Sequence, residues 1–155
     1  MDNRQMEEIV DRCGTKMFRV AAAVLHSKEE AEDAVQDAFV KLVEKRPRFE
    51  SPEHELAWLI RVTVNICKNY LRSPWRKATV PLTDDYPTET ENERDSMELL
   101  ASLPPKYRSV VHLLYYDGYS VKETARILHA TESAVRKRHS RACAMLRDTL
   151  KGEYA

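Results

Sequence analysis

The residues most able to do chemistry form a dense cluster of cations near the C-terminus. Four basic side chains fall within six positions, and a single acid, Glu132, precedes them: Arg136, Lys137, Arg138 and Arg141. Cations at this density bind the phosphates of a nucleic acid. An isolated charge run of this kind also occurs on solvated surface helices. The surrounding sequence decides between the two interpretations.

The cluster lies on the second of two short predicted helices. Ser120 followed three residues later by Glu123 forms a capping box, which predicts a helix that opens at Val121. The apolar pattern breaks after residue 128, and Thr131 can cap a second helix. Two short helices joined by a tight turn form a helix-turn-helix, whose second helix normally enters the major groove. The arrangement favours DNA binding.

Composition and periodicity indicate an all-α protein. Of the 155 residues, 43% are hydrophobic, 32% are charged and only 3 are glycine. No long stretch alternates between apolar and polar residues, as a half-buried strand would. Helical spacing of apolar residues predicts helices over 3–25, 28–46 and 55–73, and then over 93–102, 106–116 and the helix-turn-helix. Tyr70 belongs to the expected core stripe of the helix over 55–73, and Tyr115 is expected to point inward from the helix over 106–116. Residues 48–55 form either a loop or a ragged helix start with Ser51 as its cap and Pro52 at its first position.

The helix expected over 28–46 has the most regular pattern. One face is apolar: Ala31, Ala34, Val35, Ala38, Phe39, Leu42 and Val43. The opposite face is acidic and polar: Glu32, Asp33, Gln36, Asp37 and Lys41. From residue types alone, a solvated surface is the simplest interpretation of that second face.

A second basic face is expected on the helix over 55–73. Its members are spaced three and four residues apart, so they share one side: Trp58, Arg61, Asn65, Lys68 and Arg72. Cations follow the phosphates of a single strand, while amides and aromatic rings meet its bases. Core packing of Trp58 and ordinary solvation of the cations are the alternative interpretations.

Charge is distributed unevenly although the formal net charge is zero. Residues 60–77 hold five basic residues and no acid, whereas residues 78–98 hold seven acids and one arginine. The acidic stretch contains prolines and has no helical period, which predicts a flexible linker. We therefore expect two small helical modules, over 1–75 and 93–155, joined by a flexible acidic linker over 76–92.

No catalytic or metal-binding constellation is recognisable. The chain has no P-loop, HExxH or CxxC motif, and His139 with Cys143 supplies too few ligands for a structural zinc site. We expect no enzymatic activity, no metal and no cofactor. The three cysteines are far apart, which fits reduced thiols in the cytoplasm. Because no apolar run is long enough to cross a bilayer, we expect a cytoplasmic protein without membrane insertion.

Two long segments resemble bacterial RNA polymerase sigma factors. Residues 31–42 (AEDAVQDAFVKL) and 57–77 (AWLIRVTVNICKNYLRSPWRK) resemble the second conserved region of these proteins. Residues 103–142, which contain the helix-turn-helix, resemble the fourth region. A chain with only these two regions and a short linker is similar to the extracytoplasmic-function (ECF) group.

The resemblance implies a function that the bare residues leave open. Such a protein binds core RNA polymerase and promoter DNA and directs promoter-specific transcription initiation. The second region would capture the non-template strand of the minus-ten element, and the fourth would read the minus-thirty-five element as a duplex. Many relatives are held inactive by an anti-sigma factor; the expected linker would permit such a partner, although no residue identifies one.

The resemblance also assigns roles to individual positions. Contact with the minus-thirty-five duplex is expected from Arg136, Lys137, Ser140 and Arg141. Contact with the minus-ten strand is expected from Arg61, Asn65 and Lys68, with the loop over 48–55 forming a pocket for a flipped base. Docking on the polymerase is expected from Asp33, Gln36 and Asp37. The acidic linker would follow the RNA-exit path.

Two departures from the family pattern affect the fourth region. His129 stands where the family often has glycine, so either its backbone is left-handed or the turn differs. Cys143 replaces a frequent arginine, which removes one phosphate contact. The basic cluster after the helix over 55–73 is also thin. These departures bear on promoter sequence and contact strength.

Two rival interpretations stay open at this point. A stand-alone, dimeric helix-turn-helix regulator would account for residues 103–150 but would leave the first module without a role, and it predicts tight binding to a palindrome. A protein-interaction adaptor that acts through the acidic helix predicts no effect of reversing the charges at Arg136 and Arg141.

Overall fold

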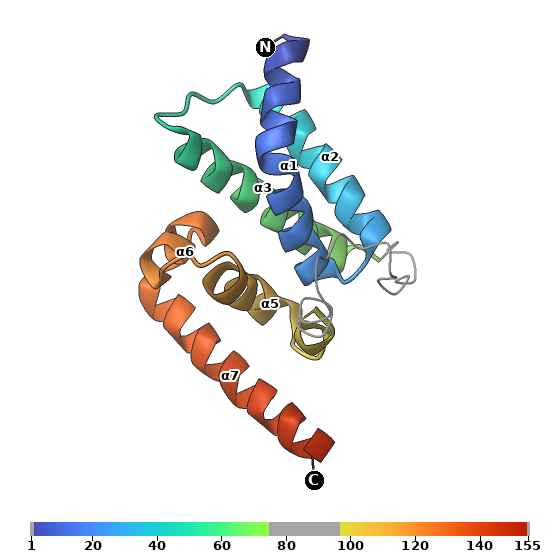
Figure 1. Cartoon of the computed structure of the whole chain (residues 1–155), viewed down its shortest axis with the longest axis vertical. Coiled ribbons are helices and arrows are strands. Elements are labelled where there is room, and N and C mark those ends of the chain that lie inside the picture. The colour runs from blue at the N-terminus through green and yellow to red at the C-terminus, as the bar shows by residue number, and fades with distance from the viewer. Residues whose placement is uncertain (1, 75–96, 155) are drawn as a thin grey trace. The chain divides into compact units, whose positions relative to one another are not determined.

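The structure is a computed structural model that describes residues 2–74 and 97–154, and the regular elements in those ranges are all helices. The chain divides into two compact units, Met1–Pro81 and Leu82–Ala155. The first contains α1 (Asn3–Leu25), α2 (Lys28–Lys45) and α3 (Pro52–Arg72); the second contains α5 (Pro105–Val111), η1 (His112–Tyr116), α6 (Val121–Leu128) and α7 (Glu132–Tyr154) (Figure 1). The all-α prediction is confirmed, and the predicted linker over 76–92 lies outside the described residues.

The first unit is a bundle in which each of the three helices contacts the other two (Figure 1). The last turns of α1, Val20–Leu25, are buried on every side, as expected of a helix end that is apolar all round. Large side chains from all three helices complete this core: Met17, Leu42, Leu59 and Ile60.

The helix ends of the first unit follow local sequence rules. Ser27 and Ser51 accept hydrogen bonds from the N–H groups of Glu30 (3.3 Å) and His54 (3.1 Å), so each caps the helix that follows it. Because Ser51 is the cap and Pro52 the first helical residue, α3 begins three residues earlier than the predicted residue 55. Of the two interpretations of residues 48–55, a loop or a helix start capped by Ser51, the second is confirmed for residues 52–55.

The buried face of α2 is narrower than predicted. Its fully buried residues are Ala31, Ala34, Ala38 and Leu42. Phe39 is only half-buried, and Val40 and Val43 are 53% and 43% exposed. The prediction that Val43 belongs to the core face is wrong. Since alanines allow neighbouring helices to approach closely, one narrow stripe is enough to seat α2 in the bundle.

The second unit packs α5 and α6 against α7, with Leu103, Tyr107, Val110, Leu113 and Val135 in its core. The helix predicted over 106–116 is present, but its last part, η1, is a π-helix closed by a hydrogen bond from the Asp117 N–H to the His112 carbonyl (3.0 Å).

The π turn changes which side chains face the core. A π turn holds about one residue more than an α turn, so the apolar stripe that precedes it loses its phase. His112 and Leu113 are buried, whereas Tyr115 is 64% exposed. The prediction that Tyr115 points inward is wrong for this reason.

The helix-turn-helix is confirmed as predicted from its capping residues. Ser120 and Glu123 exchange side-chain and backbone hydrogen bonds of 3.0 Å, which starts α6. Thr131 accepts from the Ala134 N–H (3.0 Å) and starts α7. His129 lies in the left-handed region (φ 51°), the first of the two alternatives foreseen for a residue in place of glycine.

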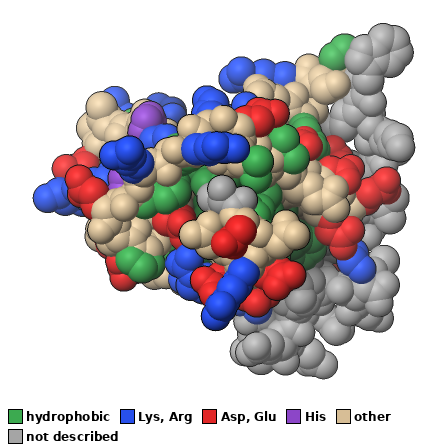
Figure 2. All heavy atoms as spheres, turned by 90° about the horizontal axis from the view of Figure 1, so that it is seen from above, with side chains coloured by type: hydrophobic (Ala, Val, Ile, Leu, Met, Phe, Trp, Pro, Cys, Tyr) green, Lys and Arg blue, Asp and Glu red, His purple; other side chains and the backbone are tan. Residues whose placement is uncertain are grey.

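Charged side chains of both signs are interspersed on the face seen in Figure 2, as a formal net charge of zero allows. Among the described helices, none combines the length and the apolar character needed to cross a membrane.

Candidate nucleic-acid interfaces

The exposed side of α7 brings together the four residues predicted to contact duplex DNA. Arg136, Lys137, Ser140 and Arg141 line one shallow surface hollow of about 310 Å³, and Ser133 is the fifth residue of its lining. Their spacing places them on one side of the helix, while Val135 and Ala142 on another side are buried in the unit. This surface is called the α7 hollow below.

The charges of the α7 hollow are available to a ligand. Arg136 pairs with Glu132 at 3.5 Å, but both side chains are largely exposed, and such surface pairs contribute only about 0–1 kcal/mol. Arg136 can therefore exchange this partner for a phosphate or a base edge. Ser133 was not predicted; its position three residues before Arg136 is the signal that identifies it.

A second groove lies between α2 and α3 of the first unit, with a volume of about 170 Å³. It is lined by Lys41, Lys45, Trp58, Arg61, Val62, Asn65, Ile66 and Asn69. We call it the α2–α3 groove. Of the three residues predicted to contact the minus-ten strand, Arg61 and Asn65 line this groove and Lys68 does not.

Sequence reasoning missed three of the five charged and amide residues that line the α2–α3 groove. Lys41 and Lys45 come from α2, and Asn69 lies one turn beyond Asn65 on α3. Periodicity could have identified Asn69, because it extends the 58, 61, 65 series by one helical turn. The two lysines could not be found this way, since their place beside α3 depends on how the helices pack.

The loop that precedes α3 is held against that helix. The Glu50 N–H donates to His54 Nδ1 (3.2 Å), and the Phe49 ring packs edge-on against His54 and Trp58, at centroid distances of 5.4 and 5.7 Å. Trp58 is half-buried and lines the groove, so it both packs against the loop and forms part of the groove surface.

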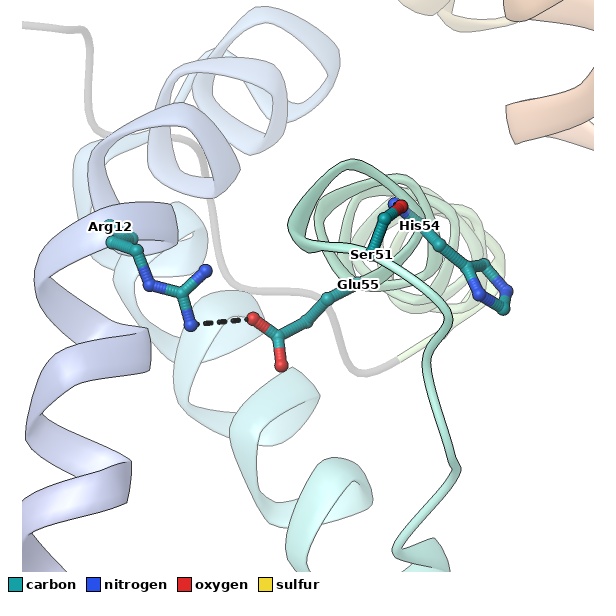
Figure 3. Close-up of polar contacts among 4 residues, drawn as sticks. All are labelled: Arg12, Ser51, His54 and Glu55. Carbon is teal, nitrogen blue, oxygen red and sulfur yellow. Dashed lines mark hydrogen bonds and ion pairs between the residues drawn. The ribbon is translucent and has the colours of Figure 1, made fainter.

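An ion pair also connects the N-terminal turn of α3 to α1. Arg12 Nη2 lies 2.8 Å from Glu55 Oε1, and Figure 3 shows this pair on one side of α3 while the His54 ring points to the other. Together with the loop contacts, the pair fixes the first turns of α3, from which the aromatic wall of the α2–α3 groove projects.

The two acids and one amide predicted to dock on polymerase are exposed on α2: Asp33, Gln36 and Asp37. The Tyr70 hydroxyl of α3 donates a hydrogen bond of 2.5 Å to Asp37 Oδ2. Burial, and then this hydrogen bond, raise the pKa of Tyr70. Sequence reasoning placed Tyr70 in the core stripe and did not foresee that it holds an exposed carboxylate.

All three cysteines are free thiols, and no group of three or more His, Cys, Asp or Glu side chains within residues 2–74 and 97–154 is arranged to hold a metal ion. Cys13 and Cys67 are buried, and burial is the main cause that raises the pKa of Cys67 to about 12. Cys143 on α7 is partly exposed.

Comparison with known proteins places both units in one family. The sigma-70 region 2 model matches residues 9–77, and the sigma-70 region 4 model matches residues 95–146. The ECF RNA polymerase sigma factor SigM of Mycobacterium tuberculosis is 31% identical over 150 residues, which cover 94% of this chain and 76% of SigM. The probable RNA polymerase sigma factor RfaY of Xanthomonas campestris is 29% identical over 157 residues, and the chain spans 39% of that protein.

Solved structures show the same fold. The sigma factor RpoE of Bartonella quintana, in complex with the anti-sigma factor NepR, matches with a TM-score of 0.77 at 22% identity, covering 96% of this chain and 98% of RpoE. CnrH, in complex with the cytosolic domain of CnrY, matches with a TM-score of 0.70 at 26% identity, covering 97% of this chain and 90% of CnrH.

The chain belongs to the ECF group of RNA polymerase sigma factors. Its function is that of a sigma factor in transcription initiation, as the resemblance predicted. A stand-alone regulator is not favoured, because the first unit matches a sigma region as well as the second.

Proposed function

We propose that the two units divide promoter recognition between them while the chain is docked on core RNA polymerase. The first, with residues 1–75 as its domain, captures the minus-ten non-template strand, and the second, over 93–155, reads the minus-thirty-five duplex. The observation that carries this proposal is that each unit has its own polar, cation-lined surface, the α2–α3 groove and the α7 hollow.

In the second unit, Arg136, Lys137, Ser140 and Arg141 enter the major groove. An arginine that binds guanine through two hydrogen bonds contributes about 1–3 kcal/mol of discrimination. A lysine on phosphate adds affinity that depends on salt but not on sequence. The shallow form of the α7 hollow supports this assignment, because a helix reads DNA with an exposed convex face rather than with a deep pocket.

In the first unit, the α2–α3 groove receives the unstacked strand. Arg61, with Lys41 and Lys45 opposite it, neutralises phosphates, while the amide of Asn65 reaches a base edge. Extruding one base costs a few kcal/mol, which these contacts have to offset. Lys68 lies on the same helix outside the groove and contacts the phosphate backbone of the DNA strand where that strand leaves the groove.

Docking uses the exposed face of α2. Asp33, Gln36 and Asp37 supply charge and hydrogen bonds, and Val40, one turn beyond Gln36, adds a half-exposed apolar residue to the same side. Exposed apolar residues bordered by polar ones are typical of protein interfaces. An anti-sigma factor as a further partner, and the cytoplasm as the place of action, stay predictions from the family.

Run-off transcription tests the proposal. The purified chain is added to core polymerase on a pool of promoter fragments, and specific initiation should appear only when both are present. Asp37→Arg should abolish it by preventing polymerase binding, and Arg141→Ala should reduce it while polymerase binding persists. Lys151→Ala, a change to an exposed cation of α7 outside the hollow, is the matched control. A chain that binds a palindrome alone and never directs initiation would overturn the proposal.

A further inference from the structure

A polar cluster outside both proposed interfaces lies where η1 meets α7. Cys143 Sγ is 3.4 Å from His139 Nε2 and 3.9 Å from the Tyr115 hydroxyl. That hydroxyl also hydrogen-bonds with His139 Nε2. A sulfur, a nitrogen and an oxygen thus converge from two elements. None of the three residues lines the α7 hollow.

The fold explains why these side chains meet. His139 and Cys143 are four residues apart on α7, so they lie one above the other on the same side of a rigid helix. The π turn of η1 places Tyr115 on the surface, and its ring lies 5.4 Å from the His139 ring, between centroids. π-helical turns are frequently found at functional sites. The cluster is therefore a product of the tertiary structure and not of sequence spacing alone.

We propose that this cluster binds a divalent cation of the zinc class. The Cys143 thiolate and His139 Nε2 are the two principal ligands, the Tyr115 oxygen is the third, and water takes the fourth position. Thiolate and imidazole are the donors that zinc prefers. Tetrahedral zinc, with bonds of about 2.3 Å to sulfur and 2.05 Å to nitrogen, separates the two donor atoms by about 3.5 Å. The observed separation is 3.4 Å.

Only small movements are needed to admit the ion. The Tyr115 hydroxyl hydrogen-bonds directly with His139 Nε2. Two ligands of the same zinc ion lie farther apart than two hydrogen-bonded atoms, so the hydroxyl has to move away from His139 by that difference. Its exposed ring can make that movement without disturbing the core. Cys143 is reachable from solvent, whereas Cys13 and Cys67 are buried.

The charge around the cluster sets the expected behaviour of the site. Arg147 Nε donates to the Cys143 carbonyl at 3.4 Å, so a cation is already near. When the cation binds, the Cys143 thiol loses its proton, and the resulting thiolate offsets part of the charge of the ion. The bound ion would tie η1 to α7 and stabilise the second unit.

The test is a titration of the full-length, metal-free, reduced chain with Co²⁺ under anaerobic conditions. A thiolate ligand gives cobalt a charge-transfer absorption, which should saturate at one equivalent and disappear when Zn²⁺ is added. Cys143→Ser should abolish the absorption. Tyr115→Phe and His139→Ala should each raise the dissociation constant by about tenfold or more. Cys13→Ala should leave the absorption unchanged, and helical circular dichroism verifies that each variant is folded.

A folded wild-type chain with no saturable cobalt absorption would overturn the proposal. So would an absorption that persists in Cys143→Ser, because the thiolate would then belong to another cysteine. A third result, binding that is equally tight in His139→Ala and in the wild type, would reduce the cluster to a lone thiol and would also overturn it.

Discussion

Removal of a single hydroxyl, by Tyr70→Phe, tests whether α3 positions the face of α2 that we propose docks on polymerase. In the wild type this hydroxyl holds Asp37 Oδ2 at 2.5 Å. Phenylalanine keeps the ring and its packing, so the change removes only the hydrogen bond. Because Asp37 is exposed, water can replace the lost donor.

The size of the effect follows from that exposure. The net contribution of a hydrogen bond to stability is about 0.5–1.5 kcal/mol, so the unfolding free energy of the first unit should fall by no more than this. The freed Asp37 side chain has to be ordered again on docking, at a cost of about 0.5–1.5 kcal/mol. Since RT is about 0.59 kcal/mol, polymerase binding should weaken roughly two- to thirteenfold.

The assay is a competition titration of core polymerase, arranged as a double-mutant cycle with Asp37→Ala. Tyr70→Phe should weaken binding in the wild-type background and have almost no effect once Asp37 is gone. Glu44→Gln, a change to another exposed acid of α2, is the control. An equal loss in both backgrounds would refute the reasoning, because Tyr70 would then act through the fold and not through Asp37.

Four further outcomes are expected. Arg141→Ala should weaken recognition of the minus-thirty-five element by about 1–3 kcal/mol, measured as the shift in sigma concentration needed for half-maximal run-off transcription. Thr131→Ala removes the cap of α7 and should lower the unfolding free energy by about 1 kcal/mol in a denaturant titration. His129→Gly relieves a left-handed backbone (φ 51°) and should raise stability by about 1–2 kcal/mol; an unchanged or lower melting temperature would contradict this. Iodoacetamide should label Cys143 in the folded chain and Cys67 only after unfolding, as mass spectrometry of the peptides would show, because burial raises the pKa of Cys67 to about 12.

The features that sequence predicted well are those set by neighbours in the chain. Capping depends on a side chain and a backbone group three residues away, so Ser51, Ser120 and Thr131 could be read directly. Because a single helix supplies the α7 hollow, its cations could be recognised from their density in the sequence, whereas Ser140 was named through the family resemblance and Ser133 was missed.

The features that sequence missed depend on packing between elements. Lys41 lines a groove only because α2 lies beside α3, and Tyr70 holds Asp37 only because the two helices are in that register. The π turn could not be read from periodicity, because an extra residue in one turn looks like the end of an apolar stripe. Its effect was to turn Tyr115 from an expected core residue into a surface ligand candidate.

The π turn of η1 also bears on how this chain can change in length. Its closing hydrogen bond, from the Asp117 N–H to the His112 carbonyl, encloses one residue more than an α-helical turn does. Loss of one residue from 112–116 would let the helix continue with ordinary α bonds, and the segments on either side would keep their angular phase. Related chains could therefore differ by one residue at this point, with or without an equivalent of Tyr115, and still present the same recognition helix.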